Sequence, residues 1–378
     1  MVPEVSEHTK QQRSQNIPAR MRLLFLSKRR PQGRDLLKRP YGRFFNLPSE
    51  LAARGHSVQL LLVDYKSGAD EAAVRNAVKI ESVGLQRNPA VIWQRIQKIS
   101  EDFAPDWVIG LSDIWYGILA ARIARRCEAH YAVDSYDNSE PYMPWAIPAH
   151  MLWRNAINGA DLVTAAGQPL LDHMTRTGCR GVTAVVPMAA DDIFFPRDRS
   201  ECRHALGLPE GGPLIGYAGS LHASRDTKLL LTVMNDFALR IPTARFVLSG
   251  RRLQGLALPP NARHLGYLPD DHVPLLLNAM DVMLALNRPT LFGEHSYPAK
   301  IYEAAACEIP FVATSTRATR WMTRASNAIL CTASNTDELT RAVQAALSRK
   351  VAHNFRPARW TAVAADFERA LRHASGQA

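Results

Sequence analysis

The chain has 378 residues, of which 47% are hydrophobic and 21% charged, as in a globular protein of two domains. Its 46 Lys and Arg against 35 Asp and Glu give a net charge of +11, which favours anionic partners such as phosphorylated substrates or an anionic lipid leaflet. No apolar run approaches the ~18–20 residues of a membrane span, and the five cysteines form no CxxC pair, which argues against a structural zinc site or a disulfide framework.

The N-terminal stretch lacks the apolar core of a signal peptide. We therefore expect residues 1–20 to form a disordered leader and the folded part to begin at Met21. The scattered cysteines are typical of reduced thiols, so we expect a cytoplasmic protein.

Short apolar runs then alternate with helical patterns. The first run, 21–26, precedes a basic loop, and 44–54 is typical of a helix that contains Pro48. Further along, the pattern predicts strands at 57–63, 107–110, 130–134, 161–165 and 183–186, and a helix at 115–126. This alternation is typical of βαβ units and predicts a doubly wound parallel sheet.

The pattern breaks at 187–197, where turn-forming residues and two prolines replace it, and then begins again. It predicts strands at 214–218, 245–249 and 282–285, helices at 226–239, 274–279 and 336–347, and helical spacing at 360–371. We expect an N-terminal Rossmann-like domain at 21–190, a C-terminal domain at 191–350, and a C-terminal helix in 351–378 that packs back towards the first domain. Ligands of such sheets bind outside the carboxyl ends of the strands.

The most informative segment is 296–314, SYPAKIYEAAACEIPFVAT. Pro298 suits the first position of a helix, Lys300 and Glu303 share one helix face, and a tight turn at Glu308 leads into a buried strand. The free N–H groups of such a helix can bind a phosphate, and a carboxylate one turn further in can accept hydrogen bonds from sugar hydroxyls. The segment therefore predicts a site for a nucleotide or a nucleotide-sugar.

Four segments in this order resemble those of GT-B glycosyltransferases, most closely the large retaining family usually called glycosyltransferase family 4, of the group 1 type. They are GHSVQLL at 55–61, VVPMAADDIFFP at 185–196, IGYAGSLHASRDTKLLL at 215–231, and the segment 296–314. The resemblance covers nearly the whole chain from Met21. It implies a GT-B fold, in which two doubly wound parallel-sheet domains face a central cleft, and transfer of a sugar from a nucleotide diphosphate-sugar to a hydroxyl acceptor, with retention and with neither a metal nor a cofactor.

The resemblance also implies roles for single residues at the donor site. Glu303 would accept hydrogen bonds from the ribose hydroxyls, although an ion pair with Lys300 also explains it. Arg225 would neutralise the departing diphosphate in a catalytic role. Gly219 and Ser220 would let the backbone approach the diphosphate. Ser220 departs from the family, which commonly carries an arginine there.

The residues before the helix depart from the family as well. Where the family usually has two glutamates spaced as Glu-x7-Glu, Glu303 fits the second, but His295 stands at the first and Glu294 precedes it. We expect His295, Ser296 and Lys300 to contact the donor. A polar loop, a helix cap at Ser296 and a solvated lysine explain them equally well.

In the N-terminal half, VDSYDNSEPY at 133–142 follows a strand. Related enzymes often place a catalytic or acceptor-contacting His or Asp at this strand end, so Asp134 or Asp137 is expected to serve. An Asx turn is an equal alternative. Asp113 is a weaker candidate of the same kind.

The first loop carries a run of basic side chains. They are Arg29, Arg30, Arg34, Lys38, Arg39 and Arg43. In the family this loop lies near the acceptor, and a lipid-carrier phosphate or an anionic leaflet would suit it; a solvated basic loop is the alternative. No DNA-binding motif accompanies the charge, so we expect no nucleic-acid partner.

The sequence thus predicts a glycosyltransferase of surface polysaccharide or lipid-linked glycan assembly, cytoplasmic and peripheral at the inner face of the cell membrane, with a saccharide or lipid-linked acceptor. Two alternatives stay open. One is a nucleotide-sugar epimerase of the same fold, and the other is a catalytically silent nucleotide-sugar-binding protein.

Overall fold

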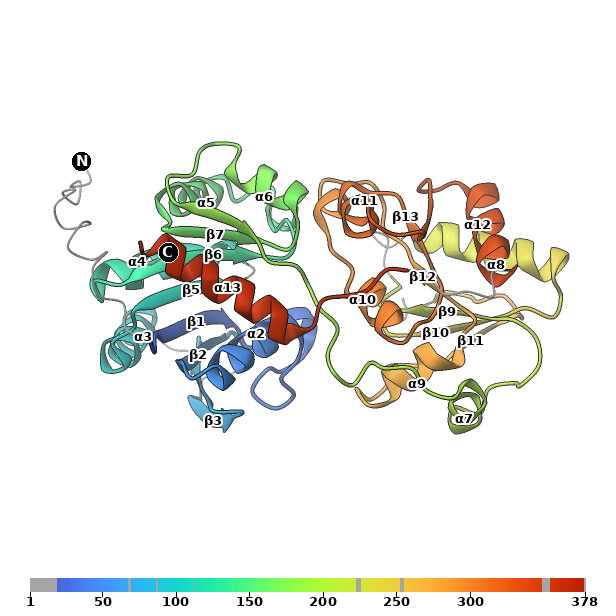
Figure 1. Ribbon diagram of the computed structural model, residues 1–378, viewed down its shortest axis with the longest axis horizontal. Coiled ribbons are helices and arrows are strands. Elements are labelled where there is room, and N and C mark those ends of the chain that lie inside the picture. The colour runs from blue at the N-terminus through green and yellow to red at the C-terminus, as the bar shows by residue number, and fades with distance from the viewer. Residues whose placement is uncertain are drawn as a thin grey trace. The chain divides into compact units, whose positions relative to one another are not determined.

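The computed structural model describes residues 19–66, 69–85, 88–111, 113–221, 226–251, 255–348 and 354–376. The chain divides into two compact units (Figure 1). The first runs to Met188 and resumes at Trp360, and the second is Ala189–Arg359. Most of the expected leader, residues 1–18, lies outside the described residues.

An eight-stranded sheet forms the first unit, in the order β3-β4-β2-β1-β5-β6-β7-β8. All neighbours pair in parallel except β3 with β4. The strands are β1 (Arg22–Lys28), β2 (Ser57–Asp64), β3 (Glu71–Arg75), β4 (Val78–Gly84), β5 (Trp107–Leu111), β6 (His130–Ser135), β7 (Leu162–Ala165) and β8 (Val182–Val185). The apolar runs predict these strands because the central ones are buried on both faces.

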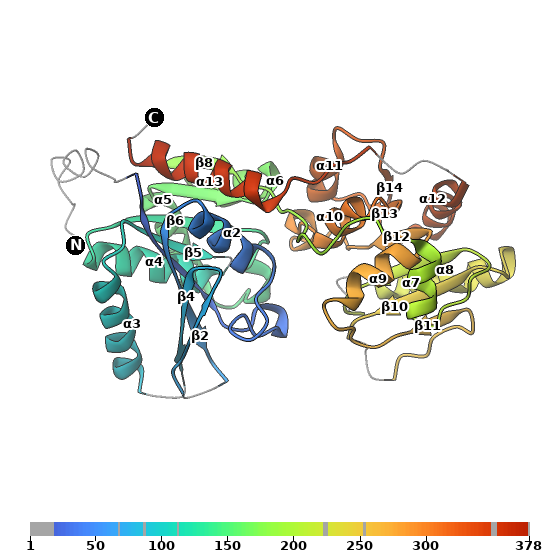
Figure 2. The same cartoon turned by 60° about the horizontal axis from the view of Figure 1, so that its bottom comes forward.

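Helices cover both faces of this sheet. They are η1 (Pro31–Gly33), α2 (Gly42–Ala53), α3 (Pro89–Phe103), α4 (Ile114–Arg126), η2 (Glu140–Tyr142), α5 (Ile147–Gly159), α6 (Gln168–Thr175) and α13 (Trp360–Ala374). Alternate side chains of β1 show the two faces: Leu24 and Leu26 join a core cluster with residues of α3 and α4, whereas the ring of Phe25 lies 6.4 Å from that of Phe367 on α13. The C-terminal helix α13 therefore packs on the first unit beside α2 (Figure 2).

A fully parallel sheet of six strands forms the second unit, in the order β11-β10-β9-β12-β13-β14. The strands are β9 (Leu214–Ala218), β10 (Arg245–Ser249), β11 (Ala262–His264), β12 (Val282–Ala285), β13 (Phe311–Thr314) and β14 (Ile329–Cys331). Its helices are α7 (Arg199–Ala205), α8 (Thr227–Arg240), α9 (His272–Ala279), η4 (Gly293–His295), α10 (Ala299–Ala306), α11 (Arg317–Thr323) and α12 (Thr336–Ser348). One core cluster joins β9 and β10 to α8 and α12. The predicted α/β class with two doubly wound sheets is confirmed.

The strand orders locate where each sheet can bind a ligand. The chain winds outward from β1 to β2 and then returns to β5 on the other side of β1, and in the second unit it does the same at β9, β10 and β12. At such a reversal the loops after two neighbouring strands part, and a crevice opens at the carboxyl edge of the sheet. Candidate site residues should therefore follow β1 and β5 in one unit and β9 and β12 in the other.

None of the helices in the described part of the chain combines the length and the apolar character that crossing a bilayer requires.

Candidate functional site

Glycine backbones meet at the carboxyl ends of β9 and β10. The N–H of Gly219 donates to the carbonyl oxygen of Ser249 at 2.8 Å, and the N–H of Gly250 donates to Gly266 at 2.9 Å. Gly250 has a φ of 128°, and a Cβ added to it would lie 2.2 Å from the carbonyl oxygen of Gly219. Only glycine fits at Gly250 for both reasons, so two loops approach each other there without side chains between them.

The sequence analysis singled out Gly219, whereas the residue whose backbone geometry requires glycine is Gly250. A Cβ on Gly219 would meet the Tyr217 hydroxyl at 3.6 Å, an ordinary contact. Ser220 is exposed, and its carbonyl accepts a hydrogen bond from the Tyr217 hydroxyl at 3.1 Å. Sequence reasoning missed Gly250, which the Ser-Gly pair at the end of an apolar strand could have revealed. Arg225, the expected catalytic cation, lies outside the described residues.

The helix of segment 296–314 is α10, which begins at Ala299. Pro298 has a ψ of 115° and is the N-cap, so the prediction that it occupies the first helical position is off by one residue. Lys300 Nζ lies 2.6 Å from Glu303 Oε2, with the two side chains 31% and 14% exposed, so the expected shared helix face is confirmed. This helix presents a cation and a carboxylate together beside its free N–H groups.

The residues before α10 are held by their own loop and by α11. His295 is buried, and its Nδ1 donates to the carbonyl oxygen of Leu291 at 3.1 Å. Ser296 is buried as well. Glu294 Oε2 accepts a hydrogen bond at 2.6 Å from the N–H of Arg317, the first residue of α11. The Glu294 carboxylate therefore binds a free N–H group at the N-terminus of α11.

Threonines join the carboxyl ends of β12 and β13. The N–H of Asn287 donates to Thr314 Oγ1 at 2.7 Å, and both residues are buried. Thr319 Oγ1 donates to the Thr314 carbonyl oxygen at 2.6 Å and takes part in a capping box with Thr316 at the start of α11. These bonds tie the loop after β12 to the end of β13 and the start of α11, and the sequence analysis had not singled them out.

In the first unit, carboxylates neutralise the first two arginines of the basic loop. Arg29 is 1% exposed and pairs with Asp35 at 3.0 Å, Asp64 at 3.3 Å and Glu71 at 2.6 Å. Arg30 pairs with Asp35 at 3.2 Å and also with Asp64. Burial raises the pKa of Asp35 and of Asp64, but the two arginines outweigh it and hold both pKa values below the ordinary range. Arg29 and Arg30 are therefore held in ion pairs inside the first unit.

Arg43 and Asp134, which the sequence analysis placed in different roles, form a buried pair. Arg43 Nε donates to Asp134 Oδ2 at 2.7 Å, and its Nη1 donates to the carbonyl oxygen of Val186 at 2.8 Å. Thr164 Oγ1 donates to Asp134 Oδ1 at 2.5 Å. Both carboxylate oxygens of Asp134 thus have partners inside the first unit, and Asp134 is fully buried.

The remaining members of the basic loop differ in their exposure. Lys38 and Arg39 are exposed, and the guanidinium of Arg34 lies 3.7 Å from the centre of the Tyr41 ring. At the reversal between β1 and β5, Lys28 Nζ lies 3.2 Å from Asp113 Oδ2. Asp113 is also the N-cap of α4, so a capped helix and a cation meet at this reversal of the strand order.

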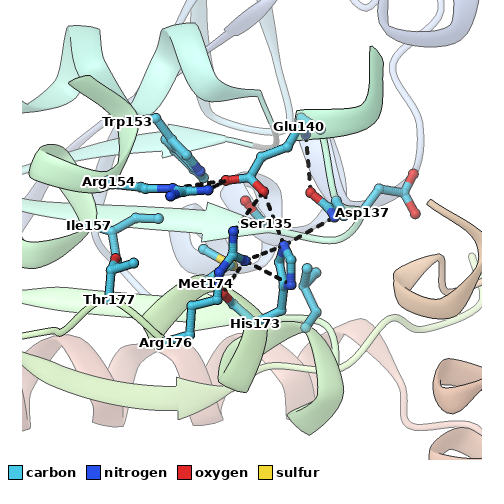
Figure 3. A pocket seen from close by; sticks show the side chains of 13 residues that line it. Ser135, Asp137, Glu140, Trp153, Arg154, Ile157, His173, Met174, Arg176 and Thr177 are labelled. Atoms are coloured by element: carbon cyan, nitrogen blue, oxygen red, sulfur yellow. Dashed lines mark hydrogen bonds and ion pairs between the residues drawn. The ribbon is translucent and has the colours of Figure 1, made fainter. Parts of the chain in front are cut away.

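A pocket opens at the carboxyl ends of β6 and β7. Its lining includes Ser135, Asp137, Glu140, Arg154, His173 and Arg176. Figure 3 shows three cationic or titratable side chains converging on Glu140. His173 Nε2 lies 3.2 Å from Glu140 Oε2, Arg176 Nη2 lies 3.1 Å from the same oxygen, and Arg154 Nη2 lies 3.2 Å from Oε1. Asp137, an expected catalytic residue, is in this lining.

The carboxylate of Glu140 is strongly stabilised as an anion. The hydrogen bond from His173 is the largest cause, and with Arg176 and Arg154 it outweighs burial and holds the pKa of Glu140 well below its ordinary value. Sequence reasoning missed this cluster because Glu140 lies in η2 and its partners lie in α5, in α6 and at the C-cap of α6. Among the described residues, no group of three or more His, Cys, Asp and Glu side chains could hold a metal ion.

Two family models match the chain. The one described as glycosyl transferase 4-like domain matches residues 43–189, and the one described as glycosyl transferases group 1 matches residues 212–349. None of the curated protein sequences compared with it matches.

Solved structures of similar fold align over almost the whole chain. Sucrose-phosphate synthase from Thermosynechococcus elongatus has a TM-score of 0.73 at 15% identity and covers 94% of this chain and 99% of its own. HepE from Anabaena, in complex with UDP and glucose, has a TM-score of 0.68 at 18% identity and covers 94% and 95%. An E. coli trehalose-6-phosphate structure bound with UDP-2-fluoro glucose has a TM-score of 0.63 at 11% identity and covers 94% and 96%. At these identities the likeness establishes the fold alone.

Proposed function

Since the chain is a glycosyltransferase of GT-B fold, we propose that it transfers a sugar from a nucleotide diphosphate-sugar to a hydroxyl acceptor, with retention of the anomeric configuration and without a metal ion. The observation that carries this proposal is the carboxyl edge of the second sheet. The backbones of Gly219 and Gly250 approach each other there, in the loops that follow β9 and β10. The loop that follows β12 leads into α10, which carries the Lys300–Glu303 pair.

The donor would bind along this edge. The close approach of the Gly219 and Gly250 backbones brings two loops together at this edge, the free N–H groups of α10 favour negative charge, and Lys300 adds a cation one residue inside the helix. Glu303 would turn from Lys300 to the ribose hydroxyls. Arg225 would neutralise the diphosphate as it leaves. HepE, a similar structure, holds UDP and glucose, which supports a uridine diphosphate-sugar as the first donor to test.

The acceptor would bind to the first unit. Asp137 fits an acceptor-contacting role better than Asp134, because Asp137 is half-buried in the lining of the pocket whereas Asp134 is fully buried against Arg43. We propose a lipid-linked saccharide as the acceptor, in surface polysaccharide assembly at the inner face of the cell membrane. The exposed Lys38 and Arg39 support an anionic acceptor or leaflet.

A panel of nucleotide-sugars tests the donor. We expect one of them to raise the melting temperature, because a ligand of the folded state stabilises it by mass action, and to release its nucleoside diphosphate when an acceptor is added. If no nucleotide-sugar shifts the melting temperature, the proposal is wrong. Conversion of the donor without an acceptor would identify an epimerase, and binding without any release would identify a silent binding protein.

A further inference from the structure

The solvent-facing side of α5 is apolar over its first two turns. Ile147 and Met151 are each 63% exposed and Leu152 is 53% exposed. The opposite side of the helix is apolar too, since Trp153 and Ile157 are buried. A surface helix normally presents polar residues to water, and a helix that is apolar all round is normally covered. The first two turns of α5 therefore lack the polar face that water requires.

The turn that enters α5 continues this surface. Tyr142 is 64% exposed and Trp145 is 77% exposed. The N–H of Met143 bonds to Glu140, and that of Ala146 bonds to Met143, so the turn is compact and places Trp145 just before the helix. We call residues 142–152 the apolar segment. Five large apolar side chains of this short segment are more than half exposed.

Other exposed parts of the described chain look different. The outer side of α3 carries Gln94, Lys98 and Asp102, all exposed. In the second unit, the exposed Leu239 lies on α8 and the exposed Tyr267 in the loop after β11, and Ile193 and Phe195 are each less than half exposed. Single exposed apolar side chains are ordinary, whereas a contiguous group marks an interaction surface.

Charge and side-chain type indicate what covers the apolar segment. It contains no acidic side chain, and Arg154 and Arg176, whose side chains are 40% and 38% exposed, lie beside it and share the carboxylate of Glu140. The whole chain carries a net charge of +11. Tyr and Trp beside aliphatic side chains, with arginines at the rim, are the composition of segments that lie at the boundary between lipid headgroups and acyl chains.

We propose that the apolar segment inserts into the headgroup region of a bilayer that contains anionic lipid, and so attaches the first unit to the membrane surface. This inference rests on the proposed function and deepens it. A lipid-linked acceptor lies in the bilayer, so an enzyme that uses one needs a contact with the membrane surface. Binding to vesicles requires neither a donor nor turnover, so it is tested separately from glycosyl transfer.

The test is co-sedimentation of the full chain with phosphatidylcholine vesicles, with and without phosphatidylglycerol. The variant is Trp145→Ser with Met151→Ser, and the matched control is Val74→Ser with Leu239→Ser, whose side chains are 70% and 84% exposed on β3 and α8. We expect the wild type and the control to bind the anionic vesicles, and the Trp145–Met151 variant to bind at least about tenfold more weakly. Thermal unfolding of each protein establishes that it is folded.

Equal binding by the variant and the control would overturn the proposal, as would a wild type that stays in the supernatant. Sedimentation velocity adds a second readout. A wild-type dimer that the Trp145–Met151 variant dissociates, without vesicle binding, would assign the apolar segment to a second copy and also overturn the proposal. Vesicle binding without transfer from any nucleotide-sugar would instead refute the proposed function and leave the membrane inference standing.

Discussion

Arg43 and Asp134 lie 91 positions apart in the sequence and form one buried ion pair, with Arg43 Nη2 at 2.5 Å from Asp134 Oδ1. Arg43 is 2% exposed and Asp134 is fully buried. The pair joins α2 to the end of β6, and a bond from Arg43 to the carbonyl oxygen of Pro187, at 3.1 Å, connects it to the segment where the chain leaves the first unit. Arg43 was expected to face an acceptor and Asp134 to act in catalysis. In the structure, the two residues together stabilise the first unit.

This pair predicts a large loss of stability from one substitution. Arg43→Ala leaves the Asp134 carboxylate buried without its cation, which costs about 3–5 kcal/mol of unfolding free energy. Urea unfolding measures it. The matched control is Arg39→Ala, an exposed member of the same loop, for which we expect a change within about 0.5 kcal/mol. An Arg43→Ala protein that keeps full stability but loses turnover would show that the pair acts in catalysis instead.

The buried strands could be predicted from the sequence because burial on both faces leaves continuous apolar runs. The predicted and observed limits agree for β9, β10 and β12. The antiparallel hairpin of β3 and β4 was missed. Its turn is Asn76–Ala77, both at positive φ, and without a glycine it carries a weak turn signal. The exposed, mixed pattern of β3 also lacks the apolar run of a central strand.

Gly250 predicts a steric effect at the carboxyl edge of the second sheet. Gly250→Ala places a Cβ against the Gly219 carbonyl oxygen at a φ of 128°, which should cost about 1–3 kcal/mol of stability and weaken UDP binding. Thermal unfolding and calorimetry with UDP measure the two effects. Gly211→Ala is the control, since a Cβ there meets nothing within 4 Å. Unchanged UDP affinity in a Gly250→Ala protein would place the diphosphate elsewhere.

The candidate site could be predicted only in part. Segment 296–314 predicts its helix and the Lys300–Glu303 pair because an i,i+3 spacing is local. Which carboxylates surround Arg29 is not local: Asp64 and Glu71 come from β2 and β3, and strand order decides that they meet. A run of basic residues therefore looks like an open patch in the sequence, whereas folding brings acids to some of its members.

Glu303 predicts a specific loss of donor affinity. A carboxylate that accepts hydrogen bonds from ribose hydroxyls contributes about 1.5–3 kcal/mol, so Glu303→Ala should weaken nucleotide-sugar binding roughly tenfold to a hundredfold. Calorimetry measures the affinity, and Asp271→Ala, an exposed acid of the same unit without a capping hydrogen bond, is the control. If both variants bind the donor equally well, Glu303 does not contact the donor and only forms the ion pair with Lys300.

Glu140 predicts a pH dependence of stability. Because His173, Arg176 and Arg154 hold its folded-state pKa well below the ordinary 4.5, the folded state binds a proton less readily than the unfolded state. The stabilisation is therefore fully present above about pH 5 and is lost as the pH falls towards the folded-state pKa. Glu140→Gln removes the charge at every pH. Its melting temperature should lie below that of the wild type at pH 7, and the difference should shrink steadily towards pH 3; a difference that is independent of pH would show that the hydrogen bonds matter and the charge does not.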